Sequence, residues 1–529
     1  MSCSGTHGRS HMSTAIVAFA FLAVCGTSFA AVHDYHNDYF FAVGDAFIFR
    51  GGREGLLNSS AKAVKTWADF GQVAPGVSNG QSEIRIDKLE FHRPRNVASQ
   101  YGPNEGWTGL VQAVIFEVND RDKIGYSSLA GYRYCCTKEL VPKTKCHLNR
   151  LIYQEGSTGW PKVIDIDFED NQTIAKPFEA TIPIQASGMY YLWFVHCDEE
   201  LSAATVAGQT TWKNPGGYLP GMMYPHIAFF AVMSLAYLAV MVVWLLLYVR
   251  HWADIFMLQH FMMAVIVMGM LEMIAWYFDY ATFNVTGRRP VLPTLWAVLV
   301  GCLRKTVART LVIMVSMGYG VVLPFLSDVQ KKQVLAFSSV YFISVTALDI
   351  ITNVGAIDDL TSTARLVMLL PVAFLDAIFI LWVFTSLSAT LRTLQSRNTT
   401  VKLQLYRRFT NALAAWVWIS AAWVAYEMYT KVTDQYNEGW RSDWVTSDFW
   451  HVLNFVFLCV LAFLWRPSAS ATRFAYSAVE DNDDFATMET GKPPPNGQTS
   501  PKRKTPRARQ APAGNGFAHV NPEEGAKQN

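Results

Sequence analysis

The stretch HIAFFAVMSLAYLAVMVVWLLLYV, residues 226–249, is an unbroken apolar run that is long enough to cross a membrane. A helix needs about 20 predominantly apolar residues to span the hydrocarbon core of a bilayer. Similar runs recur until residue 466. The seven predicted spans are 226–249, 256–281, 294–321, 334–353, 364–390, 409–429 and 450–466. The pattern therefore predicts a seven-helix transmembrane bundle, within a domain of residues 223–467.

The composition of the whole chain agrees with a membrane protein. Its 529 residues are 51% hydrophobic and 16% charged, with a net charge of +2, whereas soluble proteins carry about 25% charged residues. This near-neutral balance does not indicate binding to nucleic acid. The sequence contains no nucleophile elbow, no phosphate-binding glycine loop and no His-Glu-x-x-His motif. We therefore expect neither an enzyme nor a cofactor or metal site.

The first 30 residues have the features of a secretory signal. Arg9 and His11 precede an apolar run from Ala15 to Val24, and small residues follow up to Ala31. A short apolar run that ends in small residues is typical of a signal peptide, and a retained anchor is the alternative. We expect residues 1–30 to be removed, so that the mature N-terminus faces the lumen or the outside.

Residues 31–222 form a predicted β-sandwich. Apolar residues alternate with period two from Leu110 to Val118, and shorter patterns of the same kind occupy 84–91 and 163–168. The run from Gly188 to Cys197 is apolar at nearly every position, which favours a strand that is buried on both faces. Several short strands separated by turns are typical of a sandwich.

Cysteines and sequons in this region suit an oxidising compartment. Four cysteines precede the first span, and an even number there indicates two disulfides. Adjacent cysteines make a strained pair with each other, so we expect Cys135 and Cys136 to bond separately to Cys146 and Cys197 in either order. The glycosylation sequons on the predicted lumenal side begin at Asn58, Asn171 and Asn284.

Charges in the connecting segments predict the orientation of the spans. Lysine and arginine are in excess in cytosolic loops. The segment that follows the fifth span carries Arg392, Arg397, Lys402, Arg407 and Arg408. Seven crossings then put the N-terminal domain in the lumen and the C-terminus in the cytosol. Two basic residues on the predicted lumenal side, Arg288 and Arg289, are an exception.

Residues 468–529 form a predicted disordered cytosolic tail. They are rich in proline, glycine, asparagine and charge, a composition that cannot bury a core. Tyr476 and Val479 fit the tyrosine-x-x-bulky pattern of sorting signals that cytosolic adaptors bind. The basic run 502–509 either contacts anionic lipid or is a solvated charged segment.

Ionisable residues inside the predicted spans are the main functional candidates. They are Glu272, Asp279, Arg304, Lys305, Arg309, Asp349, Asp376 and Glu427. An unpaired charge at the bilayer centre costs at least about 2.5 kcal/mol, so these side chains must face one another, water or a ligand. Counting residues along each helix puts Glu272 and Arg304 at similar depths, and Arg309 and Asp376 nearer the middle.

We interpret these charges as the walls of a polar cavity that opens to the lumen. The third span supplies the basic wall, and the second, fourth and sixth spans supply the acidic wall. Such a cavity has two alternative uses: either the basic wall binds a lipid phosphate or another anion, or the acidic wall forms a vestibule for cations. The alternative is a set of structural ion pairs that fix the helix register and hold no ligand.

Several motifs carry a resemblance to a known family. Thr211-Trp-Lys-Asn-Pro-Gly-Gly-Tyr-Leu-Pro-Gly221 precedes the first span, and Cys135-Cys136-Thr137 lies in the predicted sandwich. With the stretches 314–324, 374–382 and 405–413, they resemble the lung seven-transmembrane receptor family, also called GOST, and especially its plant and algal members. The resemblance implies a lumenal Golgi-dynamics (GOLD) type sandwich, seven helices, a Golgi or post-Golgi location and a role in vesicle-mediated transport.

The same resemblance leaves the molecular activity open. Relatives are discussed as cargo receptors, as G-protein-associated receptors and as cation channels. The implied partners are membrane lipid, a lumenal protein cargo, and cytosolic sorting adaptors or a G-protein subunit.

Overall fold

The computed structural model describes most of residues 31–467. The described ranges are 31–58, 81–95, 109–128, 131–144, 146–156, 159–169, 172–177, 179–255, 257–319, 322, 326–354, 362–397, 400–434 and 436–467. The predicted signal peptide, the sequon at Asn171, and the predicted tail with Tyr476 and Val479 lie outside these residues.

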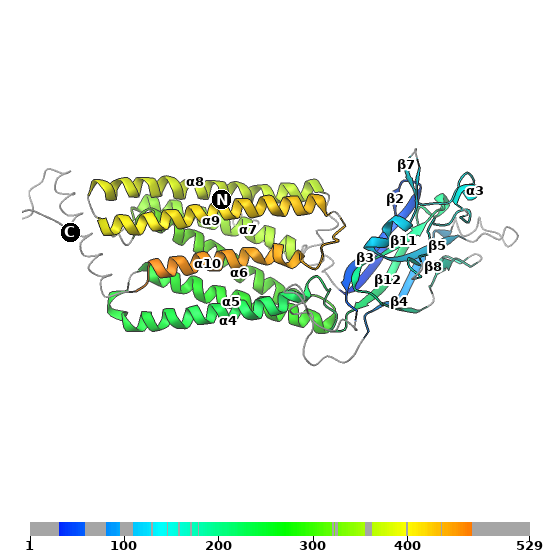
Figure 1. Ribbon diagram of the computed structural model, residues 1–529, viewed down its shortest axis with the longest axis horizontal. Coiled ribbons are helices and arrows are strands. Elements are labelled where there is room, and N and C mark those ends of the chain that lie inside the picture. Colours follow the sequence, from blue (N-terminus) through cyan, green and yellow to red (C-terminus); the bar gives the residue numbers. More distant parts are fainter. Residues whose placement is uncertain are drawn as a thin grey trace, which may run out of the picture. The chain divides into compact units, whose positions relative to one another are not determined.

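The N-terminal part of the described chain is a β-sandwich (Figure 1). One sheet has the strand order β1-β12-β4-β10, with β9 also paired to β4, and the other has the order β2-β3-β11-β5-β8. A separate two-stranded sheet joins β6 and β7. The inward faces of the two large sheets share one apolar cluster that includes Ile84, Phe91, Val111, Ile115 and Phe194. The predicted sandwich is confirmed.

Twelve strands are present in the described residues. Their bounds are β1 Val32–Tyr39, β2 Phe41–Val43, β3 Ala46–Leu56, β4 Glu83–His92, β5 Leu110–Glu117, β6 Tyr126–Ser128, β7 Gly131–Arg133, β8 Lys162–Asp167, β9 Ile174–Ala175, β10 Ala180–Pro183, β11 Gly188–His196 and β12 Thr205–Lys213. The short helix α3 spans Val141–Thr144, and 3-10 turns span Val118–Lys123, Glu199–Leu201 and Trp252–Asp254.

A β-bulge explains an irregularity in the apolar pattern of β4. Ile84 and Ile86 are buried, and so are Leu89 and Phe91, which follow after a shift of one residue. At the shift, Lys88 has φ 52° and faces Gly208 of β12, where the pairing register changes. A Cβ on Gly208 would lie 2.2 Å from the Lys88 carbonyl oxygen, so only glycine fits there.

Strands β5 and β11 are central and buried on both faces. The inner face of β5 lies in the core between the sheets, whereas Val114 and Phe116 on its outer face belong to a second cluster with Val195. The buried Gln112 is satisfied, because its Nε2 donates to Asp165 and its Oε1 accepts from the Leu151 amide. The prediction for residues 188–197 is confirmed, and β5 is more enclosed than its alternation indicated.

Two disulfides lie in the sandwich domain. Cys135 bonds Cys197 at the end of β11, and Cys136 bonds Cys146. The vicinal cysteines therefore bond separately, as predicted, in one of the two orders that the sequence allowed.

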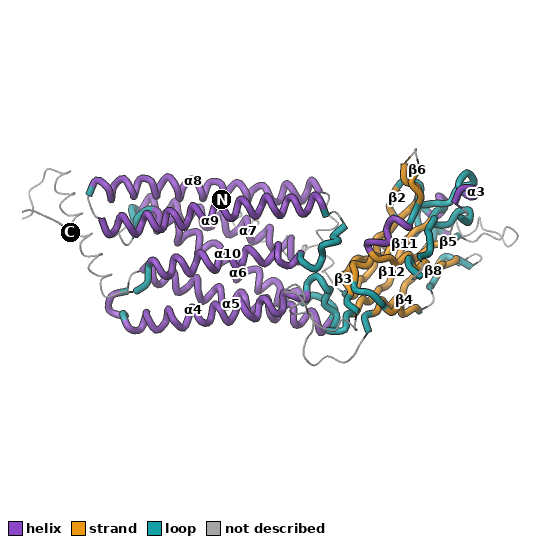
Figure 2. Tube along the Cα trace, viewed as in Figure 1, coloured by secondary structure: helices purple, strands orange, loops and turns teal. Residues whose placement is uncertain are grey.

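Seven long helices follow in the described residues. Their bounds are α4 Tyr224–Arg250, α5 Met257–Thr286, α6 Val291–Ser316, α7 Asp328–Val354, α8 Ser362–Ser396, α9 Thr400–Thr433 and α10 Asp443–Leu464. Figure 2 shows the strands in one part of the chain and the seven long helices in another. Five of these helices, α4, α5, α7, α8 and α10, are long and apolar enough to cross a membrane. Helices α6 and α9 are more polar, because α6 carries three cations and α9 has charged ends.

The helices correspond in order to the predicted spans, with different ends. Helix α6 ends at Ser316, because Gly318 takes up φ +87° just beyond it, a common way to end a helix. Helix α10 begins at Asp443, well before the predicted residue 450. The prediction from hydropathy alone left this first turn out of the span because its residues are polar, although the turn is helical.

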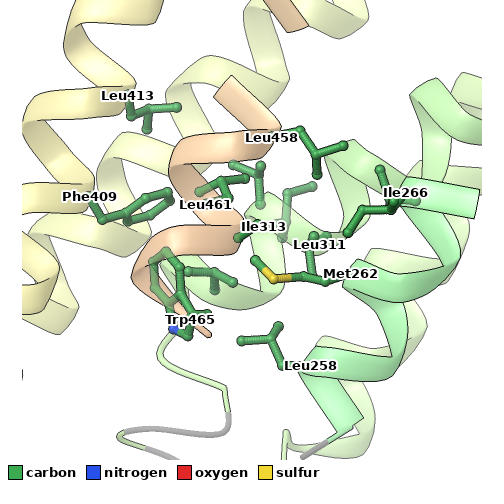
Figure 3. Packing of buried hydrophobic residues seen from close by; sticks show 14 of the residues in the cluster. Leu258, Met262, Ile266, Leu311, Ile313, Phe409, Leu413, Leu458, Leu461 and Trp465 are labelled. Carbon is green, nitrogen blue, oxygen red and sulfur yellow. The ribbon is translucent and has the colours of Figure 1, made fainter. Parts of the chain in front are cut away.

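An apolar cluster runs through the bundle and includes the end where α5 and α9 begin and α6 and α10 end. Figure 3 shows Met262 of α5, Ile313 of α6, Phe409 of α9 and Leu461 of α10 converging there. Each of these side chains is at most 4% exposed. Because lipid is as apolar as leucine, close packing rather than transfer from water holds such an interface together.

Candidate functional site: an acid-lined cavity in the helix bundle

A cavity of about 310 Å³ lies in the opposite half of the bundle, where α4, α6 and α10 begin and α5 and α7 end. Met222 and Met223, which precede α4, also contribute to its lining. The carboxylate, lysine and histidine side chains that line it are His226, Glu272, Lys305, Asp349, Asp443, Asp448 and His451. Four carboxylates thus face one lysine and two histidines, so the lining is acidic.

A deeply buried ion pair joins α5 to α6. Arg304 Nε donates to Glu272 Oε2, and the two residues are 5% and 1% exposed. Gly301 lies one turn before Arg304, and a Cβ there would be 2.7 Å from Glu272 Oε1. The absence of a side chain at Gly301 lets the carboxylate lie against α6. The two residues that helix depth placed at one level are therefore direct partners.

The other two cations of α6 also have acidic partners. Lys305 Nζ is 2.6 Å from Asp349 Oδ2 of α7. Arg309 is 2.9 Å from Asp376 Oδ1 of α8, and its guanidinium lies 4.5 Å from the centre of the Tyr341 ring. Three cations on one helix thus pair with three different neighbouring helices, which fixes their register.

Asp279 of α5 binds both the segment that connects α5 to α6 and the start of α6. This fully buried carboxylate accepts from the Thr294 hydroxyl and from Arg289 Nε, the latter at 3.1 Å. Arg289 therefore has a structural partner, although it was an exception to the predicted charge bias. Asp279 is not among the residues that line the cavity.

Glu427 does not contribute to the cavity. Its carboxylate bonds Lys431 one turn along the same helix, α9, and this lysine is 61% exposed. The acidic wall predicted from the sixth span comes instead from the seventh helix, α10. The physical reason is that an (i, i+4) partner within α9 already satisfies Glu427.

The sequence prediction missed the contribution of α10. Asp443, Asp448 and His451 all line the cavity from its first turns. His226 Nδ1 of α4 is 2.8 Å from Asp448 Oδ2, and both residues are buried. The spacing of three between Asp448 and His451 is helical, and that pattern could have extended the predicted span.

Asn284 has a local structural role. Its Nδ2 donates to the Gly216 carbonyl at 3.0 Å, and its Oδ1 accepts from the Leu219 amide at 3.1 Å. The side chain therefore ties the end of α5 to the segment between β12 and α4. Asn58 also uses its side-chain amide, which donates to the Gln185 carbonyl.

Fold and cavity together define a multi-pass membrane protein in which a β-sandwich precedes a bundle of seven helices. Residues 225–472 match the domain described as GOST, seven transmembrane domain. The matched stretch covers the part of the chain that forms the seven long helices.

Similar proteins occur in animals and fungi. Transmembrane protein 87B of Mus musculus is 35% identical over 271 residues, which are 51% of this chain and 48% of that protein. Transmembrane protein 87A of Homo sapiens is 35% identical over 274 residues, with the same two shares. An uncharacterized protein of Schizosaccharomyces pombe is 23% identical over 403 residues, 71% of this chain and 76% of its own length. The chain therefore spans about half the length of the transmembrane proteins 87 that it matches.

Proposed function

We propose that this protein acts in membrane trafficking in the Golgi or post-Golgi membranes. In this proposal the sandwich lies in the lumen and binds a cargo or partner protein, and the bundle holds the ammonium group of a lipid headgroup in its cavity. The GOST domain supports a multi-pass membrane protein. The two disulfides support a sandwich that folds in an oxidising compartment.

The excess of carboxylates in the cavity carries the proposal for the ligand. Arg304 neutralises Glu272, and Lys305 neutralises Asp349. Asp443 and Asp448 remain, with His226 beside Asp448. The cavity is thus anionic when its histidines are neutral. A cationic group is favoured there, whereas a phosphate would have to compete with carboxylates that already hold the cations of α6.

Native mass spectrometry tests this ligand. The full-length protein is released from nanodiscs that contain equal amounts of an ammonium-headgroup phospholipid and a phosphatidylglycerol with the same acyl chains. One charge-assisted hydrogen bond is worth about 1.5–3 kcal/mol, so we expect about tenfold more of the ammonium lipid to be retained.

The double variant Asp443→Asn/Asp448→Asn should lose this preference. Asp328→Asn is the matched control, because Asp328 is an exposed carboxylate at the opposite end of α7. Equal retention of both lipids by the wild-type protein, or a preference for phosphatidylglycerol, would contradict the proposal.

Proximity labelling tests the trafficking role. A labelling enzyme fused to the sandwich end of the chain in living cells should mark secreted cargo proteins in transit. Labelling of resident membrane proteins alone would argue against cargo binding.

Cation conduction is the second candidate, and the acidic lining favours it. A conducting path would have to cross the apolar cluster around Met262, Ile313 and Leu461 in the other half of the bundle. Cation flux into liposomes that contain the purified protein, with and without Glu272→Gln, tests this candidate. Flux that falls on substitution would support conduction, and its absence from both preparations would exclude it.

A further inference from the structure

The loop between α9 and α10, of which residues 436–442 are described up to the start of α10, contains Trp440, and we call it the knob. The Asp434 carboxylate at the end of α9 accepts from the amides of Glu438 and Gly439, each at 2.7 Å. Asn437 takes up φ 56°, which turns the chain between them. These bonds fix the conformation of the loop around Trp440. Although Trp440 lies in a loop, it is only 3% exposed.

Trp440 is buried because it packs into the sandwich. Its cluster contains Leu57, Val118 and Met189, with Met222 packed against it. A Cβ on Gly55 of β3 would lie 2.7 Å from Cε3 of the indole ring. The missing side chain at Gly55 thus makes room for the indole. We call the group Leu57, Val118, Met189 and Gly55 the tryptophan seat.

Two polar contacts hold the same loop from another side. The Tyr191 hydroxyl of β11 donates to the Tyr436 carbonyl at 2.7 Å. The Arg121 guanidinium lies 3.7 Å from the centre of the Tyr436 ring, a cation–π contact. Hydrophobic and directional contacts therefore fix one orientation of the knob.

The knob leads directly into the wall of the cavity. Trp440 precedes Asp443, the first residue of α10, by three residues. Asp443, Ser447, Asp448 and His451 of α10 then line the cavity, and Met222 belongs both to this lining and to the surroundings of the seat. A displacement of Trp440 would move the beginning of α10 and its carboxylates.

We propose that Trp440 is a positioning residue through which the sandwich sets the accessibility of the cavity. Occupation or distortion of the tryptophan seat changes the placement of the first two turns of α10. A partner that binds the sandwich near Gly55 would thereby change access to Asp443 and Asp448. This inference goes beyond the proposed function and does not depend on the identity of the ligand.

Cysteine labelling tests the coupling. Ser447 lines the cavity, so a Ser447→Cys variant of the full chain in nanodiscs reports access through its rate of reaction with a trimethylammonium methanethiosulfonate. The parent protein, which retains Cys302 and Cys459, supplies the background rate. Adding Trp440→Ala should change the rate at residue 447 by about fivefold or more, as for other couplings between distant sites.

Two further variants keep the test decisive. Trp252→Ala removes a tryptophan that is 70% exposed beyond the other end of α4, and it should leave the rate unchanged. Tyr191→Phe removes one hydroxyl of the attachment and should shift the rate in the same direction as Trp440→Ala, by less. If Trp440→Ala does not fold, Tyr191→Phe alone decides the matter. Rates within about twofold of Ser447→Cys alone in the folded attachment variants would overturn the proposal.

Discussion

Loss of the Arg304 guanidinium should destabilise the bundle more than loss of the whole ion pair. In Arg304→Met the Glu272 carboxylate stays buried at 1% exposure without its partner. Removing one member of a buried pair typically costs about 3–5 kcal/mol. In Arg304→Met/Glu272→Gln neither member of the pair carries a charge that must be desolvated. Replacing a buried ion pair by uncharged groups of similar volume often changes the free energy of unfolding little. We therefore expect the double variant to recover all but about 1–2 kcal/mol.

The free energy of unfolding of the full chain in bicelles measures these differences. Arg304→Met, Glu272→Gln and the double variant form a cycle, and the expected interaction term is at least about 2 kcal/mol. Lys431→Ala is the comparison, because its pair with Glu427 is exposed and on one helix. Pairs of that kind contribute about 0.3–0.5 kcal/mol. Additive losses at Arg304 and Glu272 would refute the reasoning, since the side chains would then not depend on each other.

Three further predictions concern the sandwich and its attachment. Burial lowers the pKa of His196 from 6.5 to about 4. Its contribution to stability, at most about 3 kcal/mol, is thus fully present above pH 6.5 and lost as the pH falls through 4. The amides of β11 in the full chain should lose protection from hydrogen exchange as the pH falls over this window. His196→Phe should make this protection less dependent on pH. The same pH dependence in the variant would contradict the prediction. The Cys135–Cys197 bond closes a separation of 62 residues and Cys136–Cys146 one of 10. The loss of chain entropy in the unfolded state predicts a stabilisation of about 4 and about 3 kcal/mol respectively. Variants in which both cysteines of one bond become serine should therefore show a larger fall in melting temperature for the longer loop. The reverse order would contradict the entropic argument. The side-chain amide of Asn284 donates to the Gly216 carbonyl. The variant Asn284→Gln should therefore lower the melting temperature and leave the mass lost on glycosidase treatment unchanged. A smaller mass loss in the variant would show a glycan at this site.

The fold could be predicted from the sequence because the signals for its elements are local. Apolar runs of membrane length identify helices, and the alternation in β5 identifies a strand within a sandwich. The ends of elements depend on single residues instead. Gly318 ends α6 by its positive φ, and the phase shift in β4 needs Gly208 of another strand. A hydrophobicity pattern shows neither the end of α6 nor the phase shift in β4.

The candidate site could be predicted in part. Charges within apolar helices must find partners. Counting residues placed Arg304 at the depth of Glu272 and Arg309 at that of Asp376, and the structure pairs them. The contribution of Asp443 and Asp448 was missed, because charged residues at the end of an apolar run resemble a loop. Glu427 was misplaced because the sequence does not show which face of α9 is turned inward.

The seat of Trp440 could not have been predicted. Its partners Leu57, Val118 and Met189 lie hundreds of residues away along the chain. A tryptophan in a polar loop is equally compatible with a membrane interface. Only tertiary packing distinguishes the two.

Cryo-electron microscopy of the full chain tests the central claim, an acidic cavity that holds a cationic headgroup, most directly. The protein is reconstituted in parallel into nanodiscs of an ammonium-headgroup phospholipid and of phosphatidylglycerol. The account predicts headgroup density beside Asp443 and Asp448 in the first preparation and none in the second. Density for a phosphate bound to Lys305, with the bond from Lys305 to Asp349 broken, would contradict it.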